Sequence, residues 1–170
     1  MALTKSFQGK LLISATDGKK LGEVKDVFLD ETAGKIVAVY LGKSGLINRK
    51  SLLIEIDHVA LFGIDCWMIN GSDKVIAKDD GENRDTYILA DDLRGREVQT
   101  DGGTKIGVIG DVIVDNACQV LGFSLDKLHV EGPLSQSKAI ARPAITSLGD
   151  KDNPMIASLT EAEKLSISAS

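Results

Sequence analysis

Residues 16–30 read TDGKKLGEVKDVFLD, and residues 100–115 read TDGGTKIGVIGDVIVD, so one pattern occurs twice in the chain. The second occurrence carries one additional glycine in its turn. After that glycine the stretches match at three places: Leu21-Gly22 with Ile106-Gly107, Asp26-Val27 with Asp111-Val112, and Asp30 with Asp115. Ordered self-similarity of this kind is the signature of a duplicated structural unit. The sequence therefore predicts two copies of one small fold.

The match continues downstream of this pattern in the same order. Three further pairs of segments correspond: Ile36–Leu41 with Val120–Leu125, Val59–Gly63 with Ile145–Gly149, and Met68-Ile69 with Met155-Ile156. The spacing drifts slightly from pair to pair, and we expect loops of different length to absorb the drift. The retained order of several blocks indicates a tandem duplication within the 170-residue chain rather than a chance match.

Local chemistry predicts strands in both copies. Asp17-Gly18 and its counterpart are typical of hairpin turns, because Asp and Gly accept the positive φ angles of tight turns. Gly22 and Gly107 lie inside strand-like runs, where a glycine often marks a bulge or bend. The β-branched run Ile36–Leu41 has the length of a strand. We expect an all-β protein with two small antiparallel β-barrels in tandem.

The polar, glycine-containing stretch after the first copy predicts the domain division. We expect a first domain at residues 5–78, a linker at 79–88, a second domain at 89–158 and a tail at 159–170. The linker is charged and has few apolar residues, which is typical of a surface connection. In the tail, Thr160 and Glu163 have the spacing of a capping box, which predicts at most a short helix there.

Composition and charge exclude several classes of function. The formal net charge of −5 argues against DNA or an anionic membrane as the main partner. The N-terminal residues lack the apolar segment of a signal peptide, and no apolar run is long enough to span a bilayer. Cys66 and Cys118 lie among apolar residues without a CxxC spacing, as reduced thiols do. We expect a cytoplasmic protein without membrane insertion.

No motif predicts catalysis or a bound cofactor. Gly42-Lys43-Ser44 resembles the end of a phosphate-binding loop, but Val37 stands where that motif requires a glycine. Two cysteines and two histidines could supply zinc ligands, but His58, Cys66, Cys118 and His129 lack the spacing of a structural zinc site. We therefore expect a chain that is not an enzyme and has no metal or cofactor site.

The recurring aspartates could in principle bind calcium. They are Asp17, Asp26, Asp30, Asp101, Asp111 and Asp115. They do not form the loop pattern of an EF-hand. An aspartate before glycine makes a turn, and an aspartate at a strand end accepts hydrogen bonds from exposed backbone N–H groups. We interpret these carboxylates as structural.

One loop is a candidate protein-interaction surface. Leu46 and Ile47 are followed closely by Arg49 and Lys50. Apolar residues flanked by charge are typical of a surface that binds a partner. The second copy has the more polar residues 131–138 at this place. The sequence leaves two interpretations open: the loop binds a partner, or Leu46 and Ile47 close the open end of the barrel.

The arrangement resembles the PRC-barrel family. The resemblance is carried by five features of the first copy: Gly9–Leu12, Asp17-Gly18, the run Leu21–Val27 with Asp30, the segment Ile36–Leu41 and the segment Val59–Ile69. The second copy has the same order between Leu93 and Ile156. Membership would imply a small β-barrel that binds protein partners and no common reaction.

These observations together favour one function over two alternatives. We expect a non-enzymatic protein-interaction adaptor or scaffold that forms a homodimer, because exposed strand edges tend to be covered by pairing. The first alternative is a regulatory module that binds a small molecule or metal. The second, for which the sequence offers less support, is a factor associated with RNA or the ribosome. The identity of the protein partner is not readable from the sequence.

Overall fold

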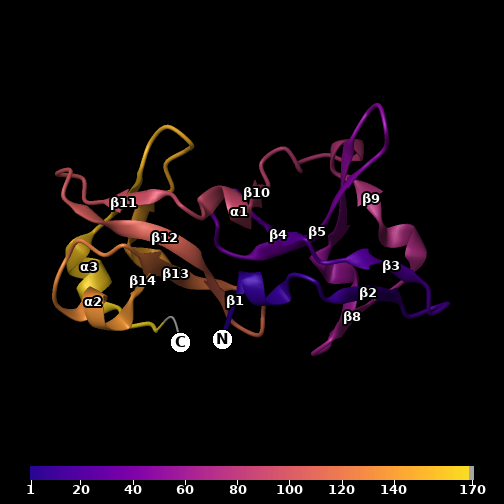
Figure 1. The fold of residues 1–170 in the computed structure, drawn as a ribbon, viewed down its shortest axis with the longest axis horizontal. Coiled ribbons are helices and arrows are strands. Elements are labelled where there is room, and N and C mark those ends of the chain that lie inside the picture. Colours follow the sequence, from indigo (N-terminus) through magenta and orange to yellow (C-terminus); the bar gives the residue numbers. More distant parts are fainter. Residues whose placement is uncertain (169–170) are drawn as a thin grey trace. The chain divides into compact units, whose positions relative to one another are not determined.

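The computed structural model describes residues 1–168 and contains two compact units (Figure 1). The N-terminal unit consists of Lys5–Glu31 and Ile36–Leu89. The C-terminal unit consists of Met1–Thr4, Thr32–Lys35 and the chain from Ala90 onward. Each unit therefore holds most of one copy of the repeat, and the C-terminal unit also holds two short segments that precede or interrupt the first copy.

The N-terminal unit is built from two sheets. The first has the order β3-β2-β8-β7, with β2 (Leu11–Ser14), β3 (Lys20–Glu23), β7 (Val59–Phe62) and β8 (Cys66–Ile69). The second has the order β10-β4-β5-β6-β9, with β4 (Asp26–Leu29), β5 (Ile36–Ser44), β6 (Lys50–Glu55), β9 (Ile76–Ala77) and β10 (Ile88–Leu89). Three 3₁₀ turns follow strands of this unit, at Ile56–His58, Ser72–Lys74 and Lys78–Asp80.

The C-terminal unit contains one sheet with the order β14-β13-β12-β11-β16-β15, and β1 also pairs with β12. Its strands are β1 (Ala2–Leu3), β11 (Glu97–Gln99), β12 (Lys105–Val114), β13 (Val120–Asp126), β14 (Ala139–Ala141), β15 (Ile145–Ser147) and β16 (Met155–Ala157). The helices are α1 (Ala90–Leu93), α2 (Pro133–Ser137) and α3 (Leu159–Lys164). A further 3₁₀ turn of this unit lies at Arg142–Ala144, and the 3₁₀ turn at Thr4–Phe7 begins with Thr4 of this unit and continues in the N-terminal unit.

This architecture confirms the expected all-β fold with tandem units and few, short helices. The pairing is antiparallel except for one pair in each copy: β2 runs parallel to β8, and β11 runs parallel to β16. In each copy the first strand of the first hairpin lies beside the second strand of the last hairpin, and the two run in the same direction. The sequence pattern did not predict this exception.

The glycines expected at irregular positions do mark bulges. In the first copy Leu12 pairs with Gly22 and Ile13 then pairs with Lys20, so the ladder skips a residue. In the second copy Val98 pairs with Gly107, and the following pair skips a residue in the same way. A side chain at position 107 would place its Cβ 3.1 Å from the backbone oxygen of Asp126. This close approach of the Asp126 backbone explains why position 107 is a glycine.

One part of the expected alignment between the copies is wrong by one residue. Leu12 pairs with Trp67 in the first copy, and Val98, at the equivalent place, pairs with Met155. Met155 therefore corresponds to Trp67, and Ile156 corresponds to Met68. The hairpin before the last strand is longer in the second copy, so matching the two methionines by residue type alone gave the wrong register.

Each copy is completed by a strand that precedes the other copy. β1 precedes the first copy and pairs with β12 of the second, with Leu3 opposite Ile113. β10 precedes the second copy and pairs with β4 of the first, with Leu89 opposite Phe28. Phe28 and Ile113 stand at equivalent places in the repeat, so the two leading strands are exchanged in the same register. In Figure 1, β1 lies along β12 within the C-terminal unit.

The segment expected as a linker, residues 79–88, is held on the N-terminal unit by polar contacts. Arg84 Nε donates to Glu55 Oε1 at 2.6 Å, and the Tyr87 hydroxyl donates to Glu55 Oε2 at 3.0 Å. Burial of the phenol and the Glu55 carboxylate raise the pKa of Tyr87 above its usual value. β10 begins at Ile88, immediately after these contacts.

The short C-terminal helix is confirmed, but its cap differs from the expected one. Ser158 precedes α3, and its Oγ accepts a hydrogen bond from the backbone N–H of Glu161 at 3.3 Å. Thr160 and Glu163, the expected capping pair, lie inside the helix. Ser158 and Glu161 have the same spacing two residues earlier, which explains the error. Residues 169–170 of the expected tail lie outside the described residues.

Candidate functional site

The β5–β6 hairpin presents the predicted interaction loop at its tip. Leu46 and Ile47 are fully exposed, at 102% and 94% of their reference areas. The turn requires Gly45, whose φ of +104° is a conformation that favours glycine and whose Cβ would lie 2.8 Å from the backbone oxygen of Asn48. This tight turn directs the two aliphatic side chains into solvent. The alternative that they close the end of the barrel is therefore wrong.

The two basic residues of the loop lie beside this apolar tip. Arg49 and Lys50 are both exposed, and Lys50 begins β6. Lys50 Nζ lies 3.3 Å from Asp80 Oδ1 in an exposed ion pair. The structure thus places all four candidate residues at one hairpin tip. The two aliphatic residues lie in the connection between β5 and β6, and the two basic residues follow them along the chain.

The corresponding segment of the second copy has a different structure. Its chain forms α2 after Gly132, whose φ is +87°. The aliphatic residue of this helix, Leu134, is buried. The second copy therefore uses its apolar residue for internal packing, whereas the first copy exposes two. The sequence showed that the loops differ, but only the structure shows the opposite directions of the side chains.

Two of the repeated aspartates confirm the structural interpretation. Asp17 Oδ1 accepts a hydrogen bond from the Lys19 backbone N–H at 3.0 Å, and this bond lowers the pKa of Asp17 below its usual value. Asp115 Oδ1 accepts from the backbone N–H groups of Ala117 and Gln119 at 2.8 and 2.9 Å. Both carboxylates hold turns, as expected for aspartates at strand ends.

Asp111 has a role that the sequence did not predict. It is buried in β12, and its Oδ1 accepts from Arg94 Nε at 2.9 Å and from the Thr4 hydroxyl at 2.6 Å. Arg94 Nη2 also donates to the Thr4 hydroxyl at 2.9 Å. We call Thr4, Arg94 and Asp111 the buried ionic cluster. It lies inside the C-terminal unit and fastens the end of β1, so its function is structural.

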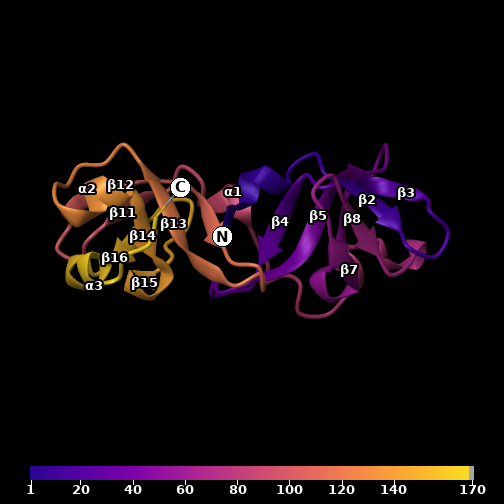
Figure 2. The same ribbon diagram turned by 90° about the horizontal axis from the view of Figure 1, so that it is seen from below.

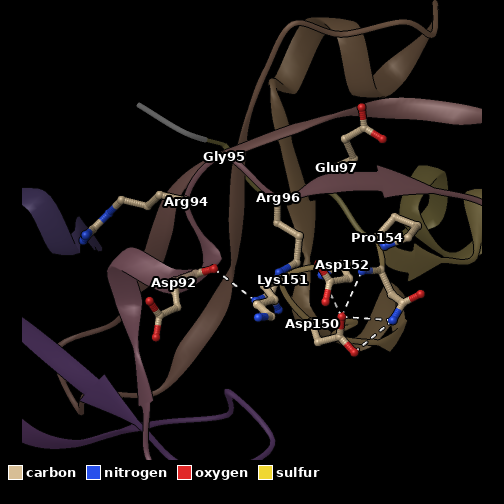
Figure 3. A pocket seen from close by; sticks show the side chains of 10 residues that line it. Asp92, Arg94, Gly95, Arg96, Glu97, Asp150, Lys151, Asp152 and Pro154 are labelled. Carbon is tan, nitrogen blue, oxygen red and sulfur yellow. Dashed lines mark hydrogen bonds between the residues drawn. The ribbon is translucent and has the colours of Figure 1, made fainter.

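A charged cleft of about 410 Å³ lies in the C-terminal unit (Figure 3). The residues that line it are Asp92, Arg94, Gly95, Arg96, Glu97, Asp150, Lys151, Asp152, Asn153 and Pro154. Arg96 donates to the backbone oxygens of Leu148 at 2.8 Å and Asp92 at 3.0 Å. Figure 3 shows the Arg94 side chain directed away from the other charged groups.

Most of the cleft's polar groups shape the loop between β15 and β16. Asp150 Oδ1 accepts from the backbone N–H groups of Asp152 and Asn153 at 2.8 and 2.9 Å, and from Asn153 Nδ2 at 2.9 Å. The Asn153 side chain is the largest cause of a lowered Asp150 pKa. In the first copy Lys10 similarly donates to the backbone oxygen of Ile64. A cation that holds the last hairpin is thus common to both copies.

The residues considered for zinc are not assembled into a site. Cys66 and Cys118 are both free thiols, and each is half-buried. Within residues 1–168 no three His, Cys, Asp or Glu side chains are grouped to hold a metal ion. In the same range, no helix combines the length and apolarity needed to cross a membrane.

Cys118 is expected to react slowly with alkylating reagents. Burial raises the pKa of its thiol, and the nearby Asp115 carboxylate raises it further. Because the thiolate is the nucleophile, a raised pKa leaves less of it at neutral pH. The test measures the pH dependence of iodoacetamide labelling in the Cys66→Ser variant. The midpoint should lie above that of a free cysteine peptide, and a midpoint at or below the peptide's would contradict the expectation.

Two repeated β-rich units, each containing the leading strand of the other copy, define a tandem β-barrel protein. The PRC-barrel domain family model matches residues 4–84 and 85–147, one match for each copy. The chain therefore belongs to the PRC-barrel family, with two domains of that type. It is also similar to the probable sporulation protein YlmC of Bacillus subtilis (strain 168), with 31% identity over 72 residues. That alignment covers 39% of this chain and 89% of the relative.

Proposed function

We propose that this protein is a cytoplasmic, non-enzymatic adaptor that binds a protein partner through the tip of its β5–β6 hairpin. The observation that carries the proposal is the full exposure of Leu46 and Ile47 at a tip flanked by two cations. Adjacent exposed aliphatic residues within a charged surround are typical of the centre of a binding surface. In the second copy the aliphatic residue of the corresponding segment, Leu134, is buried.

The chemistry of the tip indicates the kind of partner. Two aliphatic side chains favour a shallow apolar pocket on the partner, and Arg49 and Lys50 favour acidic residues at its rim. Burying one large aliphatic side chain contributes about 1.5–3 kcal/mol. Two such residues are enough to dominate the affinity of a modest interface, because a few buried residues carry most of the binding energy.

The double variant Leu46→Ser/Ile47→Ser is expected to lose the partner while the fold stays intact. Affinity purification of the full chain from its native extract, with quantitative mass spectrometry, should recover the partner at least tenfold less with the variant, since about 1.4 kcal/mol corresponds to tenfold in affinity. The free energy of unfolding should change by no more than about 0.5 kcal/mol, because the replaced side chains are exposed.

Lys19→Ala is the matched control for this variant, because Lys19 is an exposed residue in another turn of the N-terminal unit. The control should recover the partner as the unmodified chain does. Equal recovery by the unmodified chain, the control and the Leu46→Ser/Ile47→Ser variant would contradict the proposal.

A further inference from the structure

The chain leaves β8 through an asparagine followed by a glycine, Asn70-Gly71 (β8 is labelled in Figure 2). The Asn70 backbone N–H donates to the His58 oxygen at 2.9 Å, which holds the main chain of Asn70 on the β7–β8 hairpin. The Asn70 side chain is exposed and has no hydrogen-bond partner among residues 1–168. No described contact therefore holds the side-chain amide away from the main chain that follows it.

An asparagine amide can react with the backbone nitrogen of the next residue. The nitrogen forms a bond to the side-chain Cγ and gives its proton to solvent, while the amide nitrogen takes up a proton and leaves as ammonia. The product is a cyclic imide. Water then adds to one of the two imide carbonyl carbons and the bond from that carbon to nitrogen breaks, which leaves an aspartate or an isoaspartate. The reaction consumes only water and releases only ammonia.

Gly71 favours this attack for two reasons. A glycine has no Cβ, so another group can approach its backbone closely. Gly71 is buried, and its backbone N–H has no hydrogen-bond partner among residues 1–168. A buried N–H without a partner costs free energy, and the imide nitrogen carries no proton. The reaction at Gly71 therefore breaks no hydrogen bond and removes an unsatisfied donor.

The other asparagines lack this combination, although all five in the chain are exposed. The nitrogen that follows Asn116 belongs to Ala117, whose N–H donates to Asp115 Oδ1 at 2.8 Å. Asn153 precedes a proline, whose nitrogen has no proton to lose. The remaining two each precede an arginine, whose Cβ hinders the approach to its nitrogen. The four asparagines compared with Asn70 are Asn48, Asn83, Asn116 and Asn153.

We propose that Asn70-Gly71 is a site of spontaneous modification, at which the folded chain converts Asn70 into aspartate and isoaspartate. The conversion replaces a neutral amide by a carboxylate, which is charged at neutral pH. In the isoaspartate the main chain runs through Cβ and is longer by one carbon atom. That atom lies in the connection between β8 and β9, and β9 pairs with β6 through Ala77 opposite Leu52. The modification thus changes the charge and the length of this connection.

The first experiment follows the full chain during incubation at physiological temperature and mildly alkaline pH, where the backbone nitrogen loses its proton more readily. Peptide mapping by mass spectrometry should find aspartate and isoaspartate accumulating at position 70 several-fold faster than at the other four asparagines. A second sample, unfolded in urea, gives the rate without the fold. Modification of Asn70 in urea but not in the folded chain would overturn the proposal, as would an equal rate at another asparagine.

A variant of the glycine tests the attacking nitrogen while it keeps the asparagine. Gly71→Ala adds a Cβ, and the φ of 178° is extended backbone that alanine also adopts. The new Cβ would lie 2.6 Å from Asp73 Oδ1, the end of an exposed side chain that can move aside. Product at position 70 should fall several-fold. An unchanged rate in Gly71→Ala would show that the Gly71 nitrogen does not control the reaction.

Asn116→Gln is the matched control, because it removes another exposed asparagine and leaves Asn70-Gly71 intact. This control should form product at position 70 at the rate of the unmodified chain. Asn70→Gln should form none on the same timescale, because the longer side chain closes a less favourable ring. Loss of product in Asn116→Gln would contradict the assignment to Asn70.

The proposal is independent of the hairpin-tip adaptor function. The Leu46→Ser/Ile47→Ser variant changes the connection between β5 and β6 and leaves the turn after β8 unchanged. It should modify Asn70 at the rate of the unmodified chain, whether or not it retains the partner. A several-fold slower rate in this variant would contradict a reaction that depends only on Asn70 and Gly71.

Discussion

Asp111→Ala is expected to lower the free energy of unfolding by about 3 kcal/mol, because it removes the buried carboxylate of the Arg94 guanidinium and leaves the exposed Asp91 carboxylate, 3.3 Å from Nη1, as the remaining ion-pair partner described. Asp111 and Arg94 are both buried, with Nε and Oδ1 2.9 Å apart. Thr4 also loses its acceptor, so the end of β1 should loosen. Urea denaturation followed by circular dichroism measures the loss, and hydrogen exchange at β12 localises it.

Two further variants control this expectation. Glu97→Ala removes an exposed ion pair with Lys105 in the same unit and should cost no more than about 1 kcal/mol. Asp111→Ala/Arg94→Met removes both charges and should be more stable than Asp111→Ala, because the guanidinium is then no longer buried beside a missing Asp111 carboxylate. A loss for Asp111→Ala no larger than that for Glu97→Ala would show that the buried ionic cluster does not stabilise the unit.

Trp67→Ala is expected to cost about 3–5 kcal/mol in the N-terminal unit, because it leaves a large cavity in the core. Trp67 is buried in β8, and its ring meets those of Phe7 and Phe62 edge-on, with centroids 5.2 and 4.9 Å apart. The same core includes Leu12 and Ile69. Chemical denaturation followed by circular dichroism measures the loss, since the variant has no tryptophan fluorescence.

Trp67→Phe is the matched variant that tests whether the cavity causes the loss of stability. It keeps an aromatic ring between Phe7 and Phe62 and should cost clearly less than Trp67→Ala. Phe62→Ala should also cost less, because the Phe62 side chain is nearly half exposed. Equal losses for Trp67→Ala and Phe62→Ala would show that burial at Trp67 does not govern the stability of this core.

The parts of the fold that depend on neighbouring residues were predictable. The turns at Asp17-Gly18, the bulges at Gly22 and Gly107, and the strand Ile36–Leu41 follow from φ preferences and residue type, which act locally. Recurrence of the same signals in order made the duplication readable without a structure. The resemblance to the PRC-barrel family rests on the motifs of each copy, and the match of the family model to two segments of the chain confirms it.

The candidate site was predictable in place but not in detail. Composition showed that residues 46–50 combine aliphatic and basic side chains, and the hairpin presents them together. Whether Leu46 and Ile47 point inward or outward depends on the turn at Gly45, and whether Leu134 is buried depends on α2. The direction of a side chain depends on the conformation of the folded loop. Residue type alone does not determine it.

Contacts between distant residues could not be predicted at all. Arg94 stands where the first copy has Gln8, and nothing near Arg94 in the sequence indicates that it binds Asp111 or Thr4. The same holds for the position of β7 at the edge of its sheet, which can be recognised only when the order of the strands is known.

The amino-acid sequence by itself determined that this protein is a duplicated, strand-rich chain, because turns, bulges and strands are set by short-range backbone preferences. Only the tertiary structure decided which strand completes which copy. β1 and β10 are two residues long and have no pattern of their own. Their positions are set by the hydrogen-bonding edges of β12 and β4, which form only when the chain has folded.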